Sequence, residues 1–202
     1  MLEHNKHEFY HDVIHCLISA LDYRDHYTKG HSNRVGDMAL IFADLLDLDH
    51  QMKELIHISG HLHDIGKIGV ADHILNKEGE LSDIEWAEMK KHPQIGADVV
   101  NKCNSLKEVA EIIEQHHERW DGKGYPNGLI GNQIHIAARI LAVCDSIDAM
   151  SSCRPYRKPF TWDFIRQEMK KNIGSQFDPE LVKYFDKLID IWIETYEKKT
   201  AI

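Results

Sequence analysis

The segment His61-Leu62-His63-Asp64-Ile65-Gly66-Lys67 comes at the end of an apolar helical pattern. Its central pair, His63 and Asp64, offers a neutral nitrogen ligand and an anionic oxygen ligand on adjacent residues. This combination suits a borderline divalent metal such as Fe, Mn, Zn or Co. Residues of the same kinds follow downstream at His92, at the doublet His116-His117 and at Asp145. The sequence therefore predicts a metal site at the point where these four segments meet.

Composition limits the class of protein. The chain has 202 residues, of which 43% are hydrophobic, enough to form the core of one domain. It also contains 15 histidines, several of them beside carboxylates or beside one another, which favours metal binding. The net charge of −9 argues against a protein that binds long nucleic acid. A small phosphate substrate stays compatible with this charge, because bound metal ions add local positive charge.

The four cysteines form no C-x-x-C pair, which indicates reduced thiols in a cytoplasmic protein. The N-terminus is polar and lacks the apolar core of a signal peptide. No apolar run approaches the length of a membrane span. We therefore expect cytoplasmic localisation without membrane insertion.

Apolar residues recur at helical spacing along most of the chain, and no strand pattern is present. The pattern predicts helices over residues 8–24, 31–46, 51–64, 82–91, 94–102, 105–117, 133–152 and 161–173, and a closing helix that begins at 179. We expect an all-α fold in which residues 1–202 form a single helical bundle. Residues 1–24 would form an N-terminal helix that packs on the bundle or extends it.

A glycine-rich stretch over residues 118–131 holds four of the twelve glycines and is too long for a simple connector. It could be a surface Ω-loop, or a flap that places Trp120, Lys123 and Tyr125 beside the histidine doublet. We favour the flap, because binding residues concentrate on loops held by a rigid scaffold. The next helix, 133–152, is apolar on most sides and is predicted to be the buried centre, so Asp145 and Asp148 within it need partners.

Adjacent residues on a helix point about 100° apart, so adjacent ligands rarely bind one ion. His63 with Asp64, and the doublet at 116–117, are therefore interpreted as ligands shared between two metals with Asp64 bridging them. His92 and Asp145 would complete the two ligand sets. Two metals about 3.5 to 4 Å apart can hold a bridging hydroxide and clamp the attacking and leaving oxygens at phosphorus. This ligand pattern predicts phosphoester hydrolysis.

Six motifs in this order resemble the HD-GYP family, metal-dependent phosphodiesterases of the HD superfamily that hydrolyse cyclic di-GMP. They are His31-Ser32-x-Arg34-Val35, His63-Asp64-Ile65-Gly66-Lys67, Lys91-His92-Pro93, His116-His117-Glu118-Arg119-Trp120-Asp121-Gly122-x-Gly124-Tyr125-Pro126, Asp145-x-x-Asp148-Ala149-Met150 and Arg154-Pro155-Tyr156-Arg157. The His-Asp pair alone would indicate only the superfamily. The resemblance implies an HD-type bundle with a glycine-rich flap.

The resemblance also implies roles for individual residues. A centre of two divalent ions, Fe or Mn, would be bound by His63, Asp64, His92, His116, His117 and Asp145. His31 could serve a third metal, but Tyr27 stands where relatives with three metals have a glutamate, which argues against one. Asp64 and Lys67 would be catalytic, with Lys67 on the scissile phosphate. The substrate would also be held by Gly124, Tyr125, Asp148, Arg154 and Arg157.

The leading hypothesis is hydrolysis of cyclic di-GMP to pGpG, or on to GMP, through a metal-bridging hydroxide. The alternatives are an HD hydrolase for another nucleotide, and a sensor or interaction module that binds cyclic di-GMP with little turnover. A homodimer and a sensory or receiver domain in trans are further candidate partners. Other residues have simpler interpretations. Asp148 could brace the basic loop of residues 153–159, and His61 could face solvent or support a metal ligand. His57 is expected to be an ordinary surface or interface group.

Overall fold

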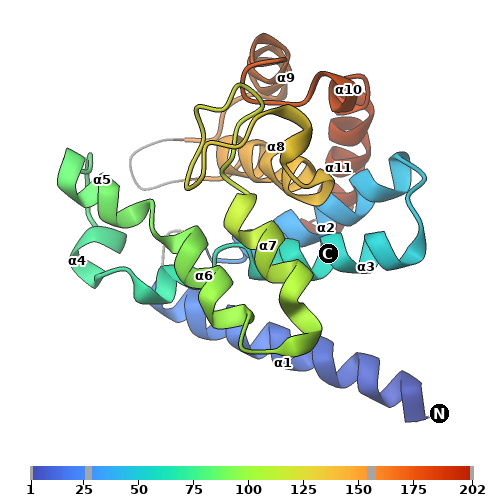
Figure 1. Ribbon diagram of the computed structural model, residues 1–202. Coiled ribbons are helices and arrows are strands. Elements are labelled where there is room, and N and C mark those ends of the chain that lie inside the picture. The colour runs from blue at the N-terminus through green and yellow to red at the C-terminus, as the bar shows by residue number, and fades with distance from the viewer. Residues whose placement is uncertain (1, 26–28, 154–157, 201–202) are drawn as a thin grey trace.

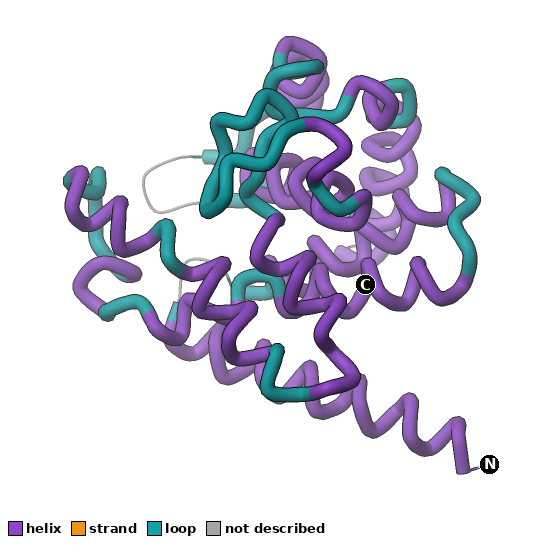
Figure 2. The backbone as a smooth tube through the Cα atoms, in the orientation of Figure 1, coloured by secondary structure: helices purple, strands orange, loops and turns teal. Residues whose placement is uncertain are grey.

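The computed structural model describes the backbone of residues 2–25, 29–153 and 158–200. Within these ranges the chain is built of α-helices and short 3-10 helices, with only the isolated bridges Asp121↔Ile130 and Ile173↔Phe177 between extended residues. Figure 2 shows the helices joined by loops. The all-α prediction is therefore confirmed.

Figure 1 labels the α-helices in chain order, and short 3-10 helices lie between some of them. The elements are α1 (Leu2–Arg24), α2 (His31–Leu45), α3 (His50–Leu62), η1 (Ile65–Gly69), α4 (Asp72–Leu75), α5 (Asp83–Met89), α6 (His92–Val100), η2 (Asn104–Leu106), α7 (Lys107–Gln115), η3 (Gly131–Gln133), α8 (Ile136–Ser151), α9 (Trp162–Lys171), α10 (Pro179–Val182) and α11 (Phe185–Thr200).

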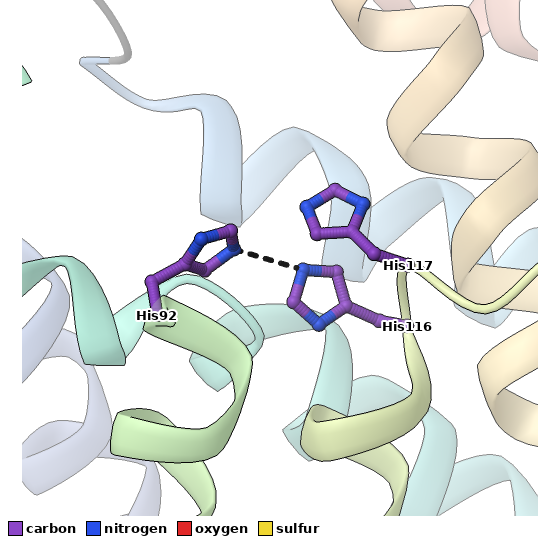
Figure 3. A group of neighbouring side chains, drawn as sticks. All are labelled: His92, His116 and His117. Carbon is purple, nitrogen blue, oxygen red and sulfur yellow. Dashed lines mark hydrogen bonds between the residues drawn. The ribbon is translucent and has the colours of Figure 1, made fainter. Parts of the chain in front are cut away.

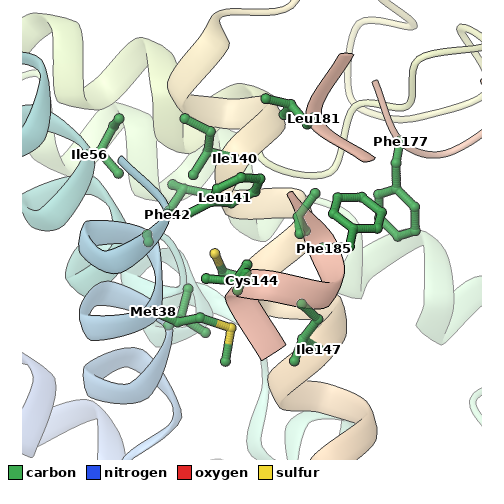
Figure 4. Packing of buried hydrophobic residues seen from close by; sticks show 14 of the residues in the cluster. Met38, Phe42, Ile56, Ile140, Leu141, Cys144, Ile147, Phe177, Leu181 and Phe185 are labelled. Carbon is green, nitrogen blue, oxygen red and sulfur yellow. The ribbon is translucent and has the colours of Figure 1, made fainter. Parts of the chain in front are cut away.

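The main core surrounds α8, as its apolar sequence predicts. Successive turns of this helix place Ile140, Leu141, Cys144 and Ile147 in full burial, packed against residues of α2 and α11. Figure 4 shows these side chains against Met38 and Phe42 on one side and Phe185 on the other. A helix that is apolar on most sides can be accommodated only in this central position.

A second, smaller core joins α1 to α3, η1, α6 and α7. Ile14 and Ile18 of α1 are buried there with Leu62, Ile65 and Ile113. In Figure 1, α1 lies along one side of the molecule, below α6 and α7. The end of α3 and the start of η1 thus lie between the two cores, which fixes the position of His63 and Asp64.

Several boundaries differ from the sequence prediction, and three of these differences have a clear physical reason. Residues 65–75, expected to form a loop, contain η1 and α4, which are too short to show a periodic pattern. Helix α6 begins at His92 rather than at 94, with Pro93 in its first turn, where proline needs no N–H partner. The expected closing helix is divided into α10 and α11. Its apolar positions keep helical spacing across the turn at Lys183, which has helical dihedral angles, so the pattern does not reveal the break.

No helix among the described residues is both long enough and apolar enough to cross a membrane.

Candidate active site

Three histidines stand at the junctions of helices and are held in the same way. His63 caps the C-terminus of α3, His116 caps that of α7, and His92 follows the end of α5 and opens α6. Each ring presents Nδ1 to the carbonyl oxygen three residues earlier: 2.7 Å to Gly60, 2.8 Å to Met89 and 2.5 Å to Ile113. A carbonyl only accepts, so each Nδ1 carries the proton and donates. Each Nε2 is therefore left with a lone pair, the form in which an imidazole binds a metal.

The Nε2 lone pairs of His92 and His116 face each other, and the ring of His117 lies beside them. The Nε2 atoms of His92 and His116 are 3.4 Å apart, a contact drawn as a dashed line in Figure 3, and the ring of His117 lies 4.0 Å from that of His116. A proton between the two Nε2 atoms would require one ring to be cationic. Burial lowers the pKa of both rings, which keeps them neutral. Nitrogen lone pairs converging in this way fit a bound cation.

Asp64 lies between two groups of histidines. Its Oδ1 is 3.4 Å from Nε2 of His92, and its Oδ2 is 3.4 Å from Nε2 of His63 and 2.8 Å from Nζ of Lys67. Burial alone would raise the pKa of Asp64, but Lys67 and His63 hold it well below its usual value. The carboxylate is thus ionised and offers one oxygen to each group.

The close approach of η1 to α6 depends on Gly66. A Cβ at this position would lie 1.9 Å from the carbonyl oxygen of His92 and 2.4 Å from the backbone nitrogen of Gly96. Any larger residue would force the two elements apart. Gly66 therefore permits Asp64 and His92 to reach the same site.

His31 and Asp145 complete the far side of the site. Nε2 of His31 is 3.2 Å from Oδ1 of Asp145 and 3.6 Å from Oδ2 of Asp64, and its Nδ1 is 2.6 Å from Oδ2 of Asp148. Burial alone would lower the pKa of His31, but the bonds to Asp145 and Asp148 raise it to about 9. Asp145, in turn, is kept ionised by His31, which holds its pKa well below the usual value against the opposing effect of burial.

The ammonium of Lys67 contacts Asp64 and also Asp25, a residue that the sequence analysis did not single out. Its Nζ is 3.4 Å from Oδ2 of Asp25, which is 2% exposed at the end of α1. Burial opposes the charge on Lys67, but Asp64 and Asp25 raise its pKa, so the ammonium is retained. No motif marks Asp25, which reaches the site only because α1 packs on η1.

A pocket of about 290 Å³ opens over these groups. Its wall includes Asp25, Lys67, Trp86, His117, Tyr125 and Asp145. The ring of Tyr125 lies 4.9 Å from the ring of His117 and 6.3 Å from that of Trp86. Charged side chains therefore form one part of the pocket wall, and aromatic rings form another.

The glycine-rich loop is held by Glu118, which is buried and accepts hydrogen bonds from the backbone N–H groups of Asn127, Gly128 and Leu129. The loop brings Tyr125 beside the histidine doublet, as expected. It places Trp120 elsewhere, in cation-π contact with Arg139 at 5.6 Å, and leaves Lys123 exposed. The expectation for Trp120 was wrong, because sequence order does not show that the loop turns back onto α8.

The remaining predicted substrate residues have different surroundings. Gly124 packs on backbone, since a Cβ there would lie 2.4 Å from the nitrogen of Arg119. Asp148 is buried and engaged by His31 and by Arg34, whose Nε is 2.6 Å from Oδ1. Tyr27, Arg154 and Arg157 lie outside the described residues.

The donor set agrees with a metal centre. Ligand atoms lie within 4.8 Å of one another in each of two groups: His92 with His116 and His117, and His63 and Asp64 with His31, which is protonated in this arrangement. Nε2 of His63 is buried without a hydrogen-bond partner, which a metal would supply. The pKa of His117 is lowered to about 3 by burial and by His92, so this ring is neutral as well. Neutral imidazoles with ionised carboxylates are the donors that divalent Fe, Mn, Zn or Co accepts.

The model of the family described as HD domain matches residues 15–181. The chain belongs to the HD domain family. Over 194 residues it is 39% identical to a cyclic di-GMP phosphodiesterase of Thermotoga maritima, covering 95% of this chain and 53% of that protein. Over 185 residues it is 38% identical to 3′3′-cGAMP-specific phosphodiesterase 2 of Vibrio cholerae, covering 91% and 35%. The resemblance to the HD-GYP phosphodiesterases is thus confirmed.

A solved structure supports the same fold. The HD domain superposes on the crystal structure of a cyclic GMP-AMP specific phosphodiesterase of V. cholerae (V-cGAP3) with a TM-score of 0.65, 20% identity, and coverage of 88% of this chain and 48% of that one. The chain spans about half or less of the length of these relatives.

Proposed function

We propose that this HD domain is a metal-dependent phosphodiesterase that hydrolyses cyclic di-GMP to pGpG, and further to GMP. The observation that carries the proposal is the position of Asp64. Its two oxygens face two histidine groups, and the ammonium of Lys67 contacts Oδ2. The names of the relatives, which include a cyclic di-GMP phosphodiesterase, support the substrate.

Two divalent ions, Fe or Mn, are proposed, held by His63, Asp64, His92, His116, His117 and Asp145. When bound, such ions lower the pKa of water to yield a nucleophile near pH 7 and offset charge on the phosphoryl oxygens. Asp64 would bridge the two ions. His31 is proposed to support the ligands rather than to bind a third metal, because its two ring nitrogens contact Asp145 and Asp148.

The remaining residues act on the substrate. Lys67 keeps its positive charge and binds the scissile phosphate, where it offsets charge as the new P–O bond forms and the bond to the ribose 3′-oxygen breaks. Tyr125, with Trp86 beside it, offers ring faces to a guanine. From the sequence alone, Gly124, Asp148, Arg154 and Arg157 stay candidates for the substrate site, and an arginine fork matches phosphate or a guanine edge.

Substitution of Asp64 by Asn tests the proposal, because it keeps the size of the side chain and removes the charge shared by both histidine groups. We expect D64N to lose bound metal and to produce no pGpG above background. Elemental analysis of anaerobically purified protein and chromatography of the products would be done on the same sample. D121N is the matched control, since Asp121 pairs with Arg119 in the loop and faces no histidine group. Full turnover in D64N would contradict the proposal.

A second candidate substrate is cyclic GMP-AMP, which the V. cholerae relative at 38% identity has in its name. Measuring kcat/KM for cyclic di-GMP and for cyclic GMP-AMP on the same metal-loaded sample distinguishes the two candidate substrates. A kcat/KM at least tenfold higher for the mixed dinucleotide would favour this second candidate.

A further inference from the structure

A second group of histidines lies outside the pocket, where α1, α2 and α3 meet. His11 and His15 stand one turn apart on α1, and His57 and His61 stand one turn apart on α3. Residues four apart share one face of a helix, so each helix presents a pair. We call these four residues with Asp37 of α2 the α1–α3 histidine cluster.

The two pairs face each other. The ring of His11 lies 5.7 Å from that of His57, and the ring of His15 lies 5.3 Å from that of His61. Within α3, Nε2 of His57 is 3.0 Å from Nε2 of His61. Nε2 of His57 is also 3.8 Å from a carboxylate oxygen of Asp37. Three helices therefore direct nitrogen and oxygen ligands to one place.

His61 is not solvent-facing, as one interpretation of the sequence allowed. His57 is half-buried where α3 meets α1, which fits the interface position that the sequence analysis allowed. His61 is 3% exposed, and its Nδ1 is buried without a hydrogen-bond partner. Its ring fits because residue 36 is glycine, where a Cβ would lie 2.9 Å from the ring. The other ring nitrogen, Nε2, faces Nε2 of His57, so it is the atom that His61 offers to a shared ligand.

The separations agree with one bound ion. Two nitrogens bound to the same zinc at about 2.0–2.1 Å lie about 3.3 Å apart in a tetrahedral site, close to the distance between His57 and His61. Ligand atoms of Asp37, His57 and His61 all lie within 4.8 Å of one another. The pair on α1 stands opposite them, so small side-chain rotations would complete four ligands.

We propose that the α1–α3 histidine cluster is a second metal site, separate from the catalytic centre, that binds zinc and clamps α1 to the bundle. Imidazole is a preferred zinc ligand, and the N/O donor set excludes Mg²⁺ and Ca²⁺, which take oxygen ligands. His15 lies nine residues before Arg24, about 14 Å along the helix axis. The site is therefore remote from the pocket end of α1.

The clamp would act on the catalytic site through α1. At its far end Arg24 donates hydrogen bonds to the carbonyl oxygens of Lys67 and Val70. Asp25, the next residue, contacts the ammonium of Lys67. Zinc near the middle of α1 thus stabilises the helix whose C-terminal end holds the η1 backbone and Lys67.

Zinc binding by the full chain tests the site. After chelator treatment, wild-type protein, H11Q/H15Q and H73Q would be dialysed against buffered zinc, and zinc per chain would be measured. His11 and His15 are half-buried or exposed, so the double variant keeps the core, and His73 is an exposed histidine of α4 outside the cluster. We expect H11Q/H15Q to bind one zinc fewer than wild type and H73Q to match wild type. Equal zinc counts and affinities in all three would overturn the proposal.

Two further measurements separate a clamp from loose surface binding. D37N, altered on α2, is expected to weaken the same zinc at least tenfold. Hydrogen exchange of the α1 amides is expected to slow on zinc addition in wild type but not in H11Q/H15Q. Turnover by the manganese-loaded double variant checks that the catalytic centre is intact. Zinc that binds without protecting α1 would refute the clamp.

Discussion

His31 touches three carboxylates, Asp64, Asp145 and Asp148, and its proton decides how these charges are balanced when metal is absent. Its pKa in the folded chain is about 9, above the value of 6.5 that it has when unfolded. A raised pKa stabilises the fold fully below pH 6.5, and this stabilisation is lost as pH rises through about 9.

The pH dependence of H31N in chelated protein tests this balance. Relative to wild type, the variant is expected to lose unfolding free energy on the order of 3 kcal/mol at pH 6 and much less at pH 9.5. Urea unfolding of both proteins across this range measures the difference. A loss that stayed constant with pH would show that His31 contributes packing rather than charge. The histidines whose pKa is lowered by burial reduce stability only below pH 6.5, and both proteins contain them, so their effect cancels in this comparison.

At the scale of the element, η1 depends on the absence of a side chain at Gly66. G66A is expected to lose about 1–3 kcal/mol of stability through overpacking, and to lose metal because Asp64 and His92 move apart. G69A in the same element is the control. A Cβ at Gly69 would meet only side-chain atoms of Ile95, which can shift. Thermal unfolding and metal content would be measured together. Unchanged metal content in G66A would contradict the role given to this contact.

The loop of residues 118–131 depends on one buried carboxylate. E118Q replaces an acceptor of three backbone N–H groups by an amide with a single acceptor oxygen, and we expect a cost of about 1–3 kcal/mol. Since the loop carries Tyr125, KM for the dinucleotide should rise more than kcat falls. The control is E114Q, because Glu114 accepts only from the side chain of Asn127. Equal kinetics in both variants would show that the loop does not need Glu118.

Helices with clear caps could be placed from sequence. The capping box of Ser82 and Glu85 begins α5 as the pattern suggests, and Pro93 marks the start of α6 to within two residues. The convergence of the His and Asp segments could be anticipated, because their residue types share one chemistry. Asp25 could not, since only the packing of α1 on η1 brings it to Lys67. The pairing of His57 with His11 was missed for the same reason: it joins two helices far apart in sequence.

At the scale of the whole molecule, charge decides when substrate can bind. The chain carries a net charge of −9, and the pocket wall contains Asp25, Asp64 and Asp145 against Lys67, a protonated His31, and Lys77, whose charge is paired with Glu85. Without metal this wall does not attract a dinucleotide with two phosphates. Metal-free protein is expected to bind a non-hydrolysable cyclic dinucleotide at least tenfold more weakly than manganese-loaded protein. Calorimetry at fixed ionic strength measures both affinities, and equal values would show that the protein alone supplies the binding energy.

The hydrogen bonds from Nδ1 of His63, His92 and His116 to the ends of their helices have a consequence for folding. The rings are oriented before any ion arrives, so little rotamer entropy is lost on loading. Under the proposed metal binding, segments from three regions of the chain would share the same ions, so each ion would be a cross-link of the native state that the unfolded chain lacks. By mass action, a free metal concentration one hundred times the Kd adds about 2.7 kcal/mol to folding. The melting temperature should therefore report the metal supply of the surroundings.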